Sequence, residues 1–153
     1  MKILDHMEET WILPDLQGTD KLSILRELSG VLVQPCKAAS PDELVQVLLE
    51  REKLGSTGIG EGIAIPHGRL KRLKKFCVAF GRSKKGVDFD SIDHHPSQIF
   101  FLVMAPENSA VENLKLLSRI VALLKDASFK KKLMDASSQK DLFRIISEEE
   151  EKY

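Results

Sequence analysis

The amino-acid sequence predicts an α/β fold, a three-layer α/β/α sandwich in which a small mixed central sheet is flanked by helices. Two observations favour this class. Helical patterns fill the first and last thirds of the chain, and short apolar segments lie between them. One of these segments, Gln98 to Met104, is apolar at every position after the first, which is typical of a strand whose sheet is covered on both faces. Such a sheet needs helices on each side.

The composition is that of a globular protein. A chain of 153 residues suits one domain, and we predict a single domain over 1–153. The 23 basic and 23 acidic side chains cancel, so global charge favours neither a nucleic-acid nor a membrane partner. No apolar run reaches the roughly 20 residues of a membrane helix, and the N-terminus lacks a secretory pattern. Cys36 and Cys77 stand apart in apolar contexts. We therefore expect a cytoplasmic protein without a membrane span.

The first third of the chain predicts a short strand followed by two helices. The strand is expected near Trp11 to Leu13. Thr19 is a candidate N-cap for the first helix, which is expected to end near Pro35. This helix carries an apolar stripe at helical spacing, at Leu22, Leu25, Leu28 and Leu32. The segment Ser40 to Glu43 has the pattern of a capping box with proline at the first helical position, and Gly55 is expected to end the second helix.

The middle of the chain predicts three strands. They are Ile63 to Ile65, Phe76 to Phe80, and Gln98 to Met104, where Pro106 follows and closes the strand. Pro66 favours an extended backbone at the residue before it. These strands supply the central sheet.

The last third predicts helices. One is expected from Val111 to Lys125, and shorter helices from about Ser128 and Ser138. The expected buried stripe of the long helix consists of Leu114, Leu117, Val121 and Leu124. Residues 148–153 are strongly acidic, and we expect them to form a frayed, solvated tail.

The connection between the second helix and Ile63 is rich in glycine. Gly58, Gly60 and Gly62 do not form the dinucleotide-binding pattern GxGxxG, because Ile63 stands where the third glycine belongs. A nucleotide phosphate loop would need Gly-Lys-Ser/Thr, which this segment lacks. The glycines either supply positive φ angles in a tight connection or also present backbone N–H groups to an anion.

His67 is the candidate reactive residue. A lone histidine is usually an ordinary surface or core residue, but this one is expected where a strand meets a loop, a place where binding residues gather. Pro66 stiffens the backbone before it, and Gly68 leaves room for a partner's side chain after it. A neutral imidazole nitrogen can attack phosphorus without first losing a proton. The pattern therefore favours reversible phosphoryl transfer on His67.

The segment from Gly58 to Gly68, GIGEGIAIPHG, closely resembles the phosphorylation site of the type-2 (fructose/mannitol) enzyme IIA of the bacterial phosphotransferase system. Arg51 to Lys53 and Ser56-Thr57 fit the same block, and the resemblance extends over almost the whole chain. The residues from Gly55 to Gly60, GSTGIG, are most similar to the nitrogen-related branch of this family, which comprises stand-alone regulatory proteins.

The resemblance implies roles for the residues of this block. His67 would accept phosphate, and the guanidinium of Arg51 would neutralise phosphoryl oxygens. Glu61 and Gly68 would lie in the active-site loop. Ser56 and Thr57 would hydrogen-bond there or only cap the turn. A solvated helix face for Arg51 and a plain turn position for Glu61 are the alternative readings. No metal or organic cofactor is implied.

Asn113 departs from the family pattern. The family usually has a histidine early in the helix after the central strand, and Asn113 stands at the matching position. Its amide can donate a hydrogen bond to a phosphoryl oxygen but carries no charge. Lys115 is the alternative residue that could supply positive charge to the phosphoryl group in place of a histidine. The substitution leaves phosphate acceptance plausible and puts its rate in question.

The resemblance also implies partners. An HPr-type carrier, or its nitrogen-branch counterpart, would donate phosphate. The output would be regulation of target proteins, transfer to a separate enzyme IIB for fructose- or mannitol-like sugars, or, if transfer has been lost, binding alone. The lack of a fused IIB or membrane domain favours regulation. The basic run between Arg69 and Lys75 is a solvated loop or, as a sharper hypothesis, a border of His67 that selects an acidic partner.

Overall fold

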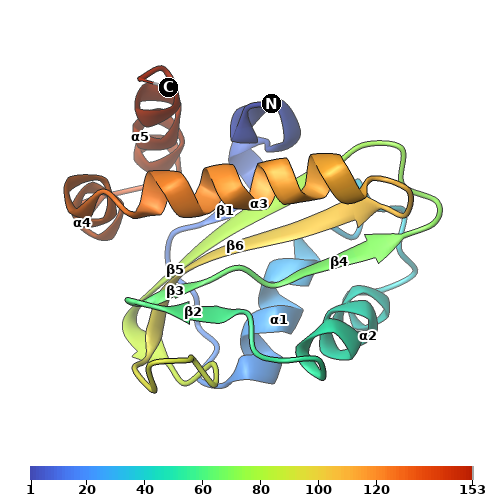
Figure 1. The fold of residues 1–153 in the computed structure, drawn as a ribbon. Coiled ribbons are helices and arrows are strands. Elements are labelled where there is room, and N and C mark those ends of the chain that lie inside the picture. The colour runs from blue at the N-terminus through green and yellow to red at the C-terminus, as the bar shows by residue number, and fades with distance from the viewer. Residues whose placement is uncertain (153) are drawn as a thin grey trace.

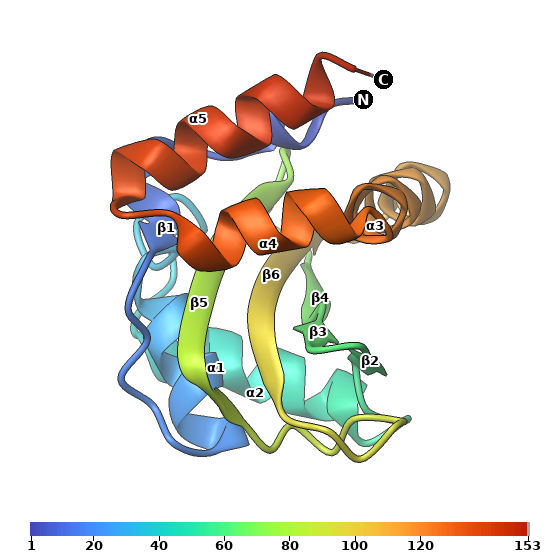
Figure 2. The same ribbon diagram turned by 90° about the vertical axis from the view of Figure 1, so that its left-hand side faces the viewer.

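The computed structural model describes residues 1–152 and has the predicted three-layer architecture (Figure 1). One mixed sheet lies between α1 and α2 on one face and α3, α4 and α5 on the other (Figure 2). The strands are β1 (Ile12–Leu13), β2 (Gly58–Gly60), β3 (Ile63–Ala64), β4 (His67–Leu70), β5 (Cys77–Val87) and β6 (Ser97–Pro106). The helices are η1 (Ile3–His6), η2 (Glu9–Trp11), α1 (Lys21–Gly30), α2 (Pro41–Glu52), α3 (Ala110–Leu124), α4 (Ala127–Asp135) and α5 (Gln139–Glu150). Within residues 1–152, none of these helices combines the length and apolarity needed to cross a bilayer.

The sheet is ordered β1-β5-β6-β3-β2, with β4 also paired to β6. β5 is antiparallel to β6, and β2 is antiparallel to β3. β1 runs parallel to β5, whereas β3 and β4 both run parallel to β6. β3 and β4 pair with successive stretches of β6, since Ala64 lies opposite Phe100 and His67 opposite Val103. Pro66 separates them because it has no N–H to donate, although its carbonyl accepts the N–H of Val103 at 2.9 Å.

The unbroken apolar run of β6 is explained by two cores. Ile99, Phe101 and Val103 pack into the core under α3, α4 and α5. Phe100, Leu102 and Met104 alternate with them and pack into the core above α1 and α2. Because successive side chains of a strand point to opposite faces, a strand covered on both sides is apolar at every position.

The first helix begins one residue later and ends earlier than its sequence pattern predicts. Asp20 is the N-cap of α1, and its carboxylate accepts the N–H of Ser23 at 2.8 Å. The predicted cap Thr19 is therefore wrong by one residue. α1 ends at Gly30, and turns rather than helix lead to Pro35.

The second helix starts at the predicted place by a different contact. Ser40 is the N-cap, but its side chain makes no capping hydrogen bond. The carboxylate of Glu43 instead accepts the N–H of Ala39 at 3.3 Å. Gly55 follows the helix with φ +139°, as expected for a residue that ends it.

The predicted stripe of α3 is wrong at its first member, since Leu114 is 67% exposed. Leu124 is buried as predicted, and Leu117 and Val121 are partly buried against the same core. The residues that α3 buries are Asn113, Leu116, Ile120, Leu123 and Leu124. The helix is apolar on more than one side, so spacing alone could not decide which side faces β6.

The acidic C-terminal segment is not a frayed tail up to Glu150. Glu149 and Glu150 belong to α5 and are buried. The Glu150 carboxylate accepts the backbone N–H groups of Ile3 and Leu4, at 2.7 and 2.9 Å. Arg119 of α3 donates to it at 2.7 Å. This carboxylate therefore joins the two ends of the chain, which lie side by side in Figure 2. The rest of the predicted tail consists of the exposed Glu151 and Lys152 and of residue 153, which lies outside the described residues.

Arg82 is a buried structural residue that the sequence pattern did not indicate. It lies in β5 and is 1% exposed. Its guanidinium donates to the carbonyls of Leu133 and Ala136, at 2.9 and 2.7 Å, and to Pro14 at 2.9 Å. These bonds satisfy carbonyl groups at the end of α4, which would otherwise lack partners.

Candidate active site around His67

His67 is the first residue of β4 and not, as predicted, the end of the preceding strand. The strand resumes after Pro66, at the edge of the sheet where β4 pairs with β6. His67 lies opposite Val103, whose side chain belongs to the core on the α3 side. The ring is half-buried.

The two ring nitrogens have different partners. Nδ1 lies 2.9 Å from the carbonyl oxygen of Ile65, which can only accept a hydrogen bond. Nε2 accepts the Nε–H of Arg51 at 3.2 Å. Because a guanidinium has donors only, Nε2 must carry a lone pair, and the proton of the neutral ring stays on Nδ1. The neighbours thus fix one tautomer.

The surroundings keep the ring neutral. Burial lowers the pKa of His67 below its ordinary value of 6.5, and the positive charges of Arg51 and Arg69 lower it further. The hydrogen bond to Ile65 and the carboxylate of Glu52 oppose these effects without reversing them. A lone pair on Nε2 is therefore available at neutral pH.

Arg51 reaches His67 from the last turn of α2. Its Nη1 donates to the carbonyl of Gly55 at 2.9 Å, while its Nε–H meets the imidazole. Arg51 and His67 are 16 positions apart in sequence, and the structure brings them together as the resemblance implied.

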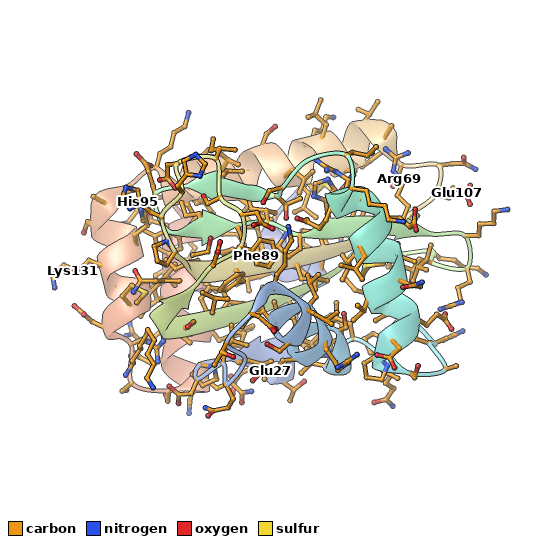
Figure 3. The ribbon with its side chains drawn as sticks, turned by 90° about the horizontal axis from the view of Figure 1, so that it is seen from below. Glu27, Arg69, Phe89, His95, Glu107 and Lys131 are labelled. Atoms are coloured by element: carbon orange, nitrogen blue, oxygen red, sulfur yellow. The ribbon has the colours of Figure 1, made fainter. Side chains whose placement is uncertain are left out.

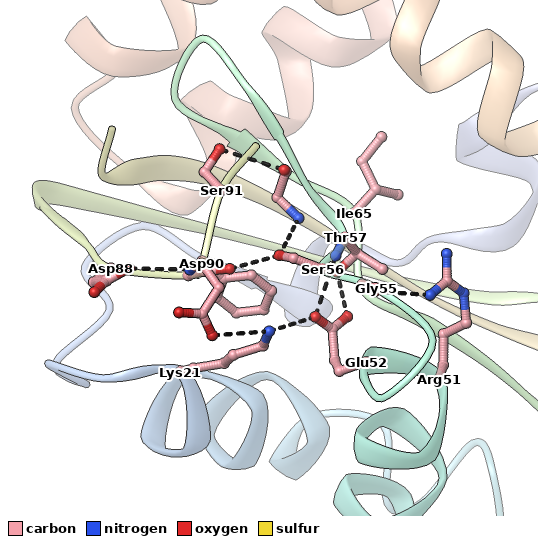
Figure 4. Close-up of polar contacts among 12 residues, drawn as sticks. Lys21, Arg51, Glu52, Gly55, Ser56, Thr57, Ile65, Asp88, Asp90 and Ser91 are labelled. Atoms are coloured by element: carbon pink, nitrogen blue, oxygen red, sulfur yellow. Dashed lines mark hydrogen bonds and ion pairs between the residues drawn. The ribbon is translucent and has the colours of Figure 1, made fainter. Parts of the chain in front are cut away.

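Ser56 and Thr57 build the turn that follows α2, and their side chains bond to Phe89, Gly58 and Glu52 rather than to the imidazole. Figure 4 shows the bonds of this turn. Ser56 Oγ donates to the carbonyl of Phe89 at 2.7 Å and accepts the N–H of Gly58 at 3.0 Å. Thr57 is buried and donates its N–H and its hydroxyl to Glu52. Sequence reasoning missed Glu52, whose only signal was its position beside Arg51.

Glu61 lies at the tip of the β2–β3 hairpin, so the predicted glycine turn is partly a strand. The tip has positive φ at Gly60, Glu61 and Gly62. The N–H of Glu61 donates to Asp93 at 2.9 Å, and its carbonyl accepts Lys130 Nζ at 2.6 Å. Hydrogen bonds from the Glu61 and His95 N–H groups hold the pKa of Asp93 at about 2.

Figure 3 labels His95 and Arg69 toward different ends of the molecule. The N–H of His95 and the N–H of Glu61 both donate to the Asp93 carboxylate. Arg69 lies two residues after His67 in β4. These contacts do not bring Glu61 to the imidazole.

Gly68 is required by packing within the fold. A Cβ at this position would lie 2.6 Å from Cγ1 of Val47 on α2, far inside van der Waals contact. Gly68 is itself buried. The predicted reason for this glycine, room for a partner's side chain, is therefore replaced by close approach of α2 to β4.

Asn113 is buried in the first turns of α3, with 6% of its surface exposed. Its Oδ1 has no hydrogen-bond partner within residues 1–152. Buried side-chain oxygens are nearly always bonded, so an unpaired one indicates a functional site or an absent partner. Lys115, two residues later, is exposed.

The basic run after His67 is only partly a loop. Arg69 belongs to β4 and is exposed. Arg72 donates to the carbonyl of Cys36 at 2.8 Å and pairs with Glu43. Lys71, Lys74 and Lys75 are exposed, as in the solvated-loop interpretation.

The site thus places an imidazole with a lone pair on Nε2 beside a guanidinium. Comparison with known proteins gives the family of the chain. The family model for the phosphoenolpyruvate-dependent sugar phosphotransferase system, EIIA 2, matches residues 5–149. The chain belongs to this family.

Three comparisons extend the match. A nitrogen regulatory protein of Bradyrhizobium diazoefficiens is 36% identical over 147 residues, which cover 96% of this chain and 95% of the relative. The crystal structure of the nitrogen regulatory protein IIA-Ntr from Neisseria meningitidis matches with a TM-score of 0.87 at 32% identity, over 93% of this chain and 97% of that one. Mannitol enzyme IIA of Escherichia coli, solved with phosphorylated enzyme IIB, has a TM-score of 0.76 at 26% identity, over 93% of this chain and 99% of that one.

Membership in the EIIA 2 family makes the chain a component of the phosphotransferase system, as its sequence motif predicts. It also confirms the mixed α/β fold, because the family's solved structures share it. The site residues of this EIIA 2 chain rest on the geometry around His67.

Proposed function

We propose that this EIIA 2 chain accepts a phosphoryl group on Nε2 of His67. The observation that carries the proposal is the division of roles between the ring nitrogens: Ile65 holds the proton on Nδ1, and the Nε2 lone pair faces Arg51. In the transfer, a bond forms between Nε2 and phosphorus while the bond from phosphorus to the donor's histidine breaks. The electron pair of that bond returns to the donor's ring. No proton has to move, because the Nδ1 proton stays in place.

Arg51 is proposed to bind the phosphoryl group. Its guanidinium already lies 3.2 Å from the nitrogen that would carry phosphorus. When phosphorus takes the Nε2 lone pair, the freed N–H can turn to a phosphoryl oxygen. A guanidinium is always charged and donates in a fork, which suits phosphate. The carbonyl of Gly55, which accepts a hydrogen bond from Nη1, would hold the Arg51 side chain near His67 during the transfer.

Asn113 is proposed as a second, neutral ligand of the phosphoryl group. His67 lies on the face of the sheet that α3 covers, and the buried Asn113 amide has no partner for Oδ1. An amide that is not fixed at its oxygen can turn its NH₂ toward a phosphoryl oxygen. We expect Asn113→Leu, which removes the donor, to slow phosphoryl acceptance about tenfold, as for a hydrogen bond worth about 1.4 kcal/mol. Asn113→His is expected to retain acceptance.

Ser56, Thr57 and Gly68 are proposed to shape the site rather than contact phosphorus. Their hydrogen bonds and packing are within the fold. Glu61 is proposed to have a structural role at the tip of the β2–β3 hairpin, where it bonds to Asp93 and Lys130.

The upstream partner is proposed to be a phosphorylated HPr-type carrier or its nitrogen-branch counterpart. The downstream role is proposed to be regulatory, in which the phosphorylation state of His67 controls binding to other proteins. Support comes from two matched proteins, in Bradyrhizobium and Neisseria, that are called nitrogen regulatory proteins and align over almost their full length.

Transfer to an enzyme IIB during sugar uptake is the second candidate. The mannitol enzyme IIA that shares this fold was solved with its phosphorylated IIB, which supports it. A purified IIB that removes the phosphoryl group from this chain would favour this candidate over regulation.

Reconstitution tests the proposal. The chain is incubated with phosphoenolpyruvate, enzyme I and HPr-type carriers, and phosphorylation is followed by intact mass. We expect one acid-labile phosphoryl group on wild type and on His95→Gln, an exposed histidine elsewhere, and none on His67→Gln. Phosphorylation of His67→Gln would refute the assignment, and none on folded wild type with any carrier would favour a binding module that has lost transfer.

A further inference from the structure

Lys21 and Glu52 form a largely buried charge cluster at the junction of α1, α2 and the turn after α2 (Figure 4). The Glu52 side chain is 5% exposed, and Lys21 Nζ lies 2.6 Å from its Oε1. The same oxygen accepts the N–H of Thr57 at 3.2 Å, and Oε2 accepts the Thr57 hydroxyl. Lys21 also lies 4.8 Å from the centroid of the Phe89 ring and 3.5 Å from Asp90. Three donors, Lys21 Nζ and the N–H and hydroxyl of Thr57, therefore converge on the Glu52 carboxylate.

The cluster is connected to Nδ1 of His67 by two further bonds. The carbonyl of Thr57 accepts the N–H of Ile65 at 3.0 Å. The carbonyl of Ile65 in turn accepts the Nδ1–H of His67 at 2.9 Å. The position of Thr57 therefore fixes the peptide that orients the imidazole, and Glu52 fixes Thr57.

The same turn also holds the other side of the imidazole. Gly55, two residues before Thr57, accepts Arg51 Nη1 at 2.9 Å, and Arg51 Nε–H meets Nε2. Glu52 follows Arg51 directly in the last turn of α2. A turn that loosens would move both the acceptor at Nδ1 and the donor at Nε2.

We infer that Glu52 is a positioning residue for phosphoryl transfer, acting through Thr57 on both nitrogens of His67. The inference rests on the proposed function of His67 as acceptor. Glu52 needs its charge, since three donors converge on its carboxylate. A glutamine has one acceptor oxygen and would turn its NH₂ group toward either Lys21 or the Thr57 hydroxyl.

The test compares Glu52→Gln with Glu50→Gln, the same change two residues earlier on α2, where the side chain is exposed and pairs with Lys53. Thr57→Val and Thr57→Ser form a second pair, because only serine keeps the hydroxyl that donates to Glu52. For each variant, the rate of phosphorylation by a saturating phosphorylated HPr-type carrier is measured. Ring ¹⁵N spectra of the unphosphorylated protein report the tautomer of His67, a readout that lower stability alone does not move.

We expect Glu52→Gln to slow phosphorylation by about 10- to 100-fold, the effect of misplacing reacting groups by up to about 1 Å. Its His67 ring signals should shift away from those of a fixed Nδ1–H tautomer. Thr57→Val should be slowed about fivefold or more, by the loss of one hydrogen bond, with Thr57→Ser and Glu50→Gln close to wild type.

A Glu52→Gln protein with the wild-type rate, or with unchanged His67 ring signals, would overturn the inference. If that variant does not fold, equal rates for Thr57→Val and Thr57→Ser would overturn it instead. Failure of wild type to become phosphorylated would refute the proposed function alone, because the ring spectra of the unphosphorylated variants would still test the positioning by Glu52.

Discussion

Replacing Gly68 with alanine tests how closely α2 must approach the strand that begins with His67. The new Cβ would lie 2.6 Å from Cγ1 of Val47, whereas its contacts with Met104 and Leu48, at 3.6 and 3.8 Å, are ordinary. Carbon atoms pack best about 3.5–4.0 Å apart, so β4 or α2 must move by about 1 Å. Overpacking of this kind costs about 1–3 kcal/mol, and the lower entropy of unfolded alanine offsets about 0.4–1 kcal/mol of it.

Urea unfolding measures the result. We expect Gly68→Ala to lose about 1–2 kcal/mol of unfolding free energy. Val47→Ala should relieve the clash, so the double variant should be more stable than the sum of the single effects by about 1 kcal/mol. Since a shift of β4 also moves His67, phosphoryl acceptance should fall in Gly68→Ala, by up to about 100-fold, and recover in the double variant.

Strictly additive effects of Gly68→Ala and Val47→Ala would refute the packing argument. So would a Gly68→Ala protein that is as stable as wild type but no longer accepts phosphate from its carrier. That second result would restore the explanation from sequence, in which Gly68 leaves room for a partner.

Four further predictions concern stability and pH. Glu150→Ala should lower the unfolding free energy by about 3 kcal/mol, because it leaves buried N–H groups and Arg119 unpaired. The control Glu151→Ala, at an exposed position, should change that free energy by less than about 0.5 kcal/mol. Similar values for the two variants in urea unfolding would contradict the role of Glu150. Arg82→Met should cost about 3 kcal/mol by leaving carbonyls of α4 without donors, and a neutral effect would show that water replaces the guanidinium. Protonation blocks the Nε2 lone pair, so phosphoryl acceptance should fall only below pH 6.5, because burial and Arg51 lower the pKa of His67. Arg51→Gln should raise that pKa in an NMR titration, and an unchanged or lower value would contradict the charge effect.

The linkage of His67 to stability has a definite sign. The pKa of His67 in the folded protein lies below its ordinary value of 6.5, so the unfolded chain binds the proton more readily. This histidine therefore destabilises the fold as pH falls through 6.5 toward the lower folded value, and has no such effect at higher pH.

The sequence predicted those features of the fold that depend on local pattern. The unbroken run of β6 indicated two covered faces, and the structure has a core on each. Pro41 placed the start of α2 correctly. The exposure of Leu114 in α3 and the partners of Glu150 depend on which elements pack together, and neither leaves a periodic signal in the chain. β4 was missed because Pro66 and the following charges conceal a strand of four residues.

The site was predictable only in part for a similar reason. His67 and Arg51 were predicted as candidates, since a histidine after proline and an arginine fit a known motif, and the structure places them in contact. Glu52 was not, because a glutamate on a helix is usually solvated, and only the fold shows that Lys21 and Thr57 converge on it. Glu61 belongs to the same motif in sequence, but the hairpin carries it toward Asp93 and Lys130.

The most direct test of the account is which nitrogen of His67 carries phosphorus. The chain, labelled with ¹⁵N in its histidines, is phosphorylated by its carrier, and long-range ¹H–¹⁵N spectra are recorded before and after. We predict an Nδ1–H tautomer before the reaction and phosphorus on Nε2 after it, with the Nδ1 proton retained. Phosphorus on Nδ1, or an Nε2–H tautomer in the unphosphorylated protein, would contradict the roles assigned to Ile65 and Arg51.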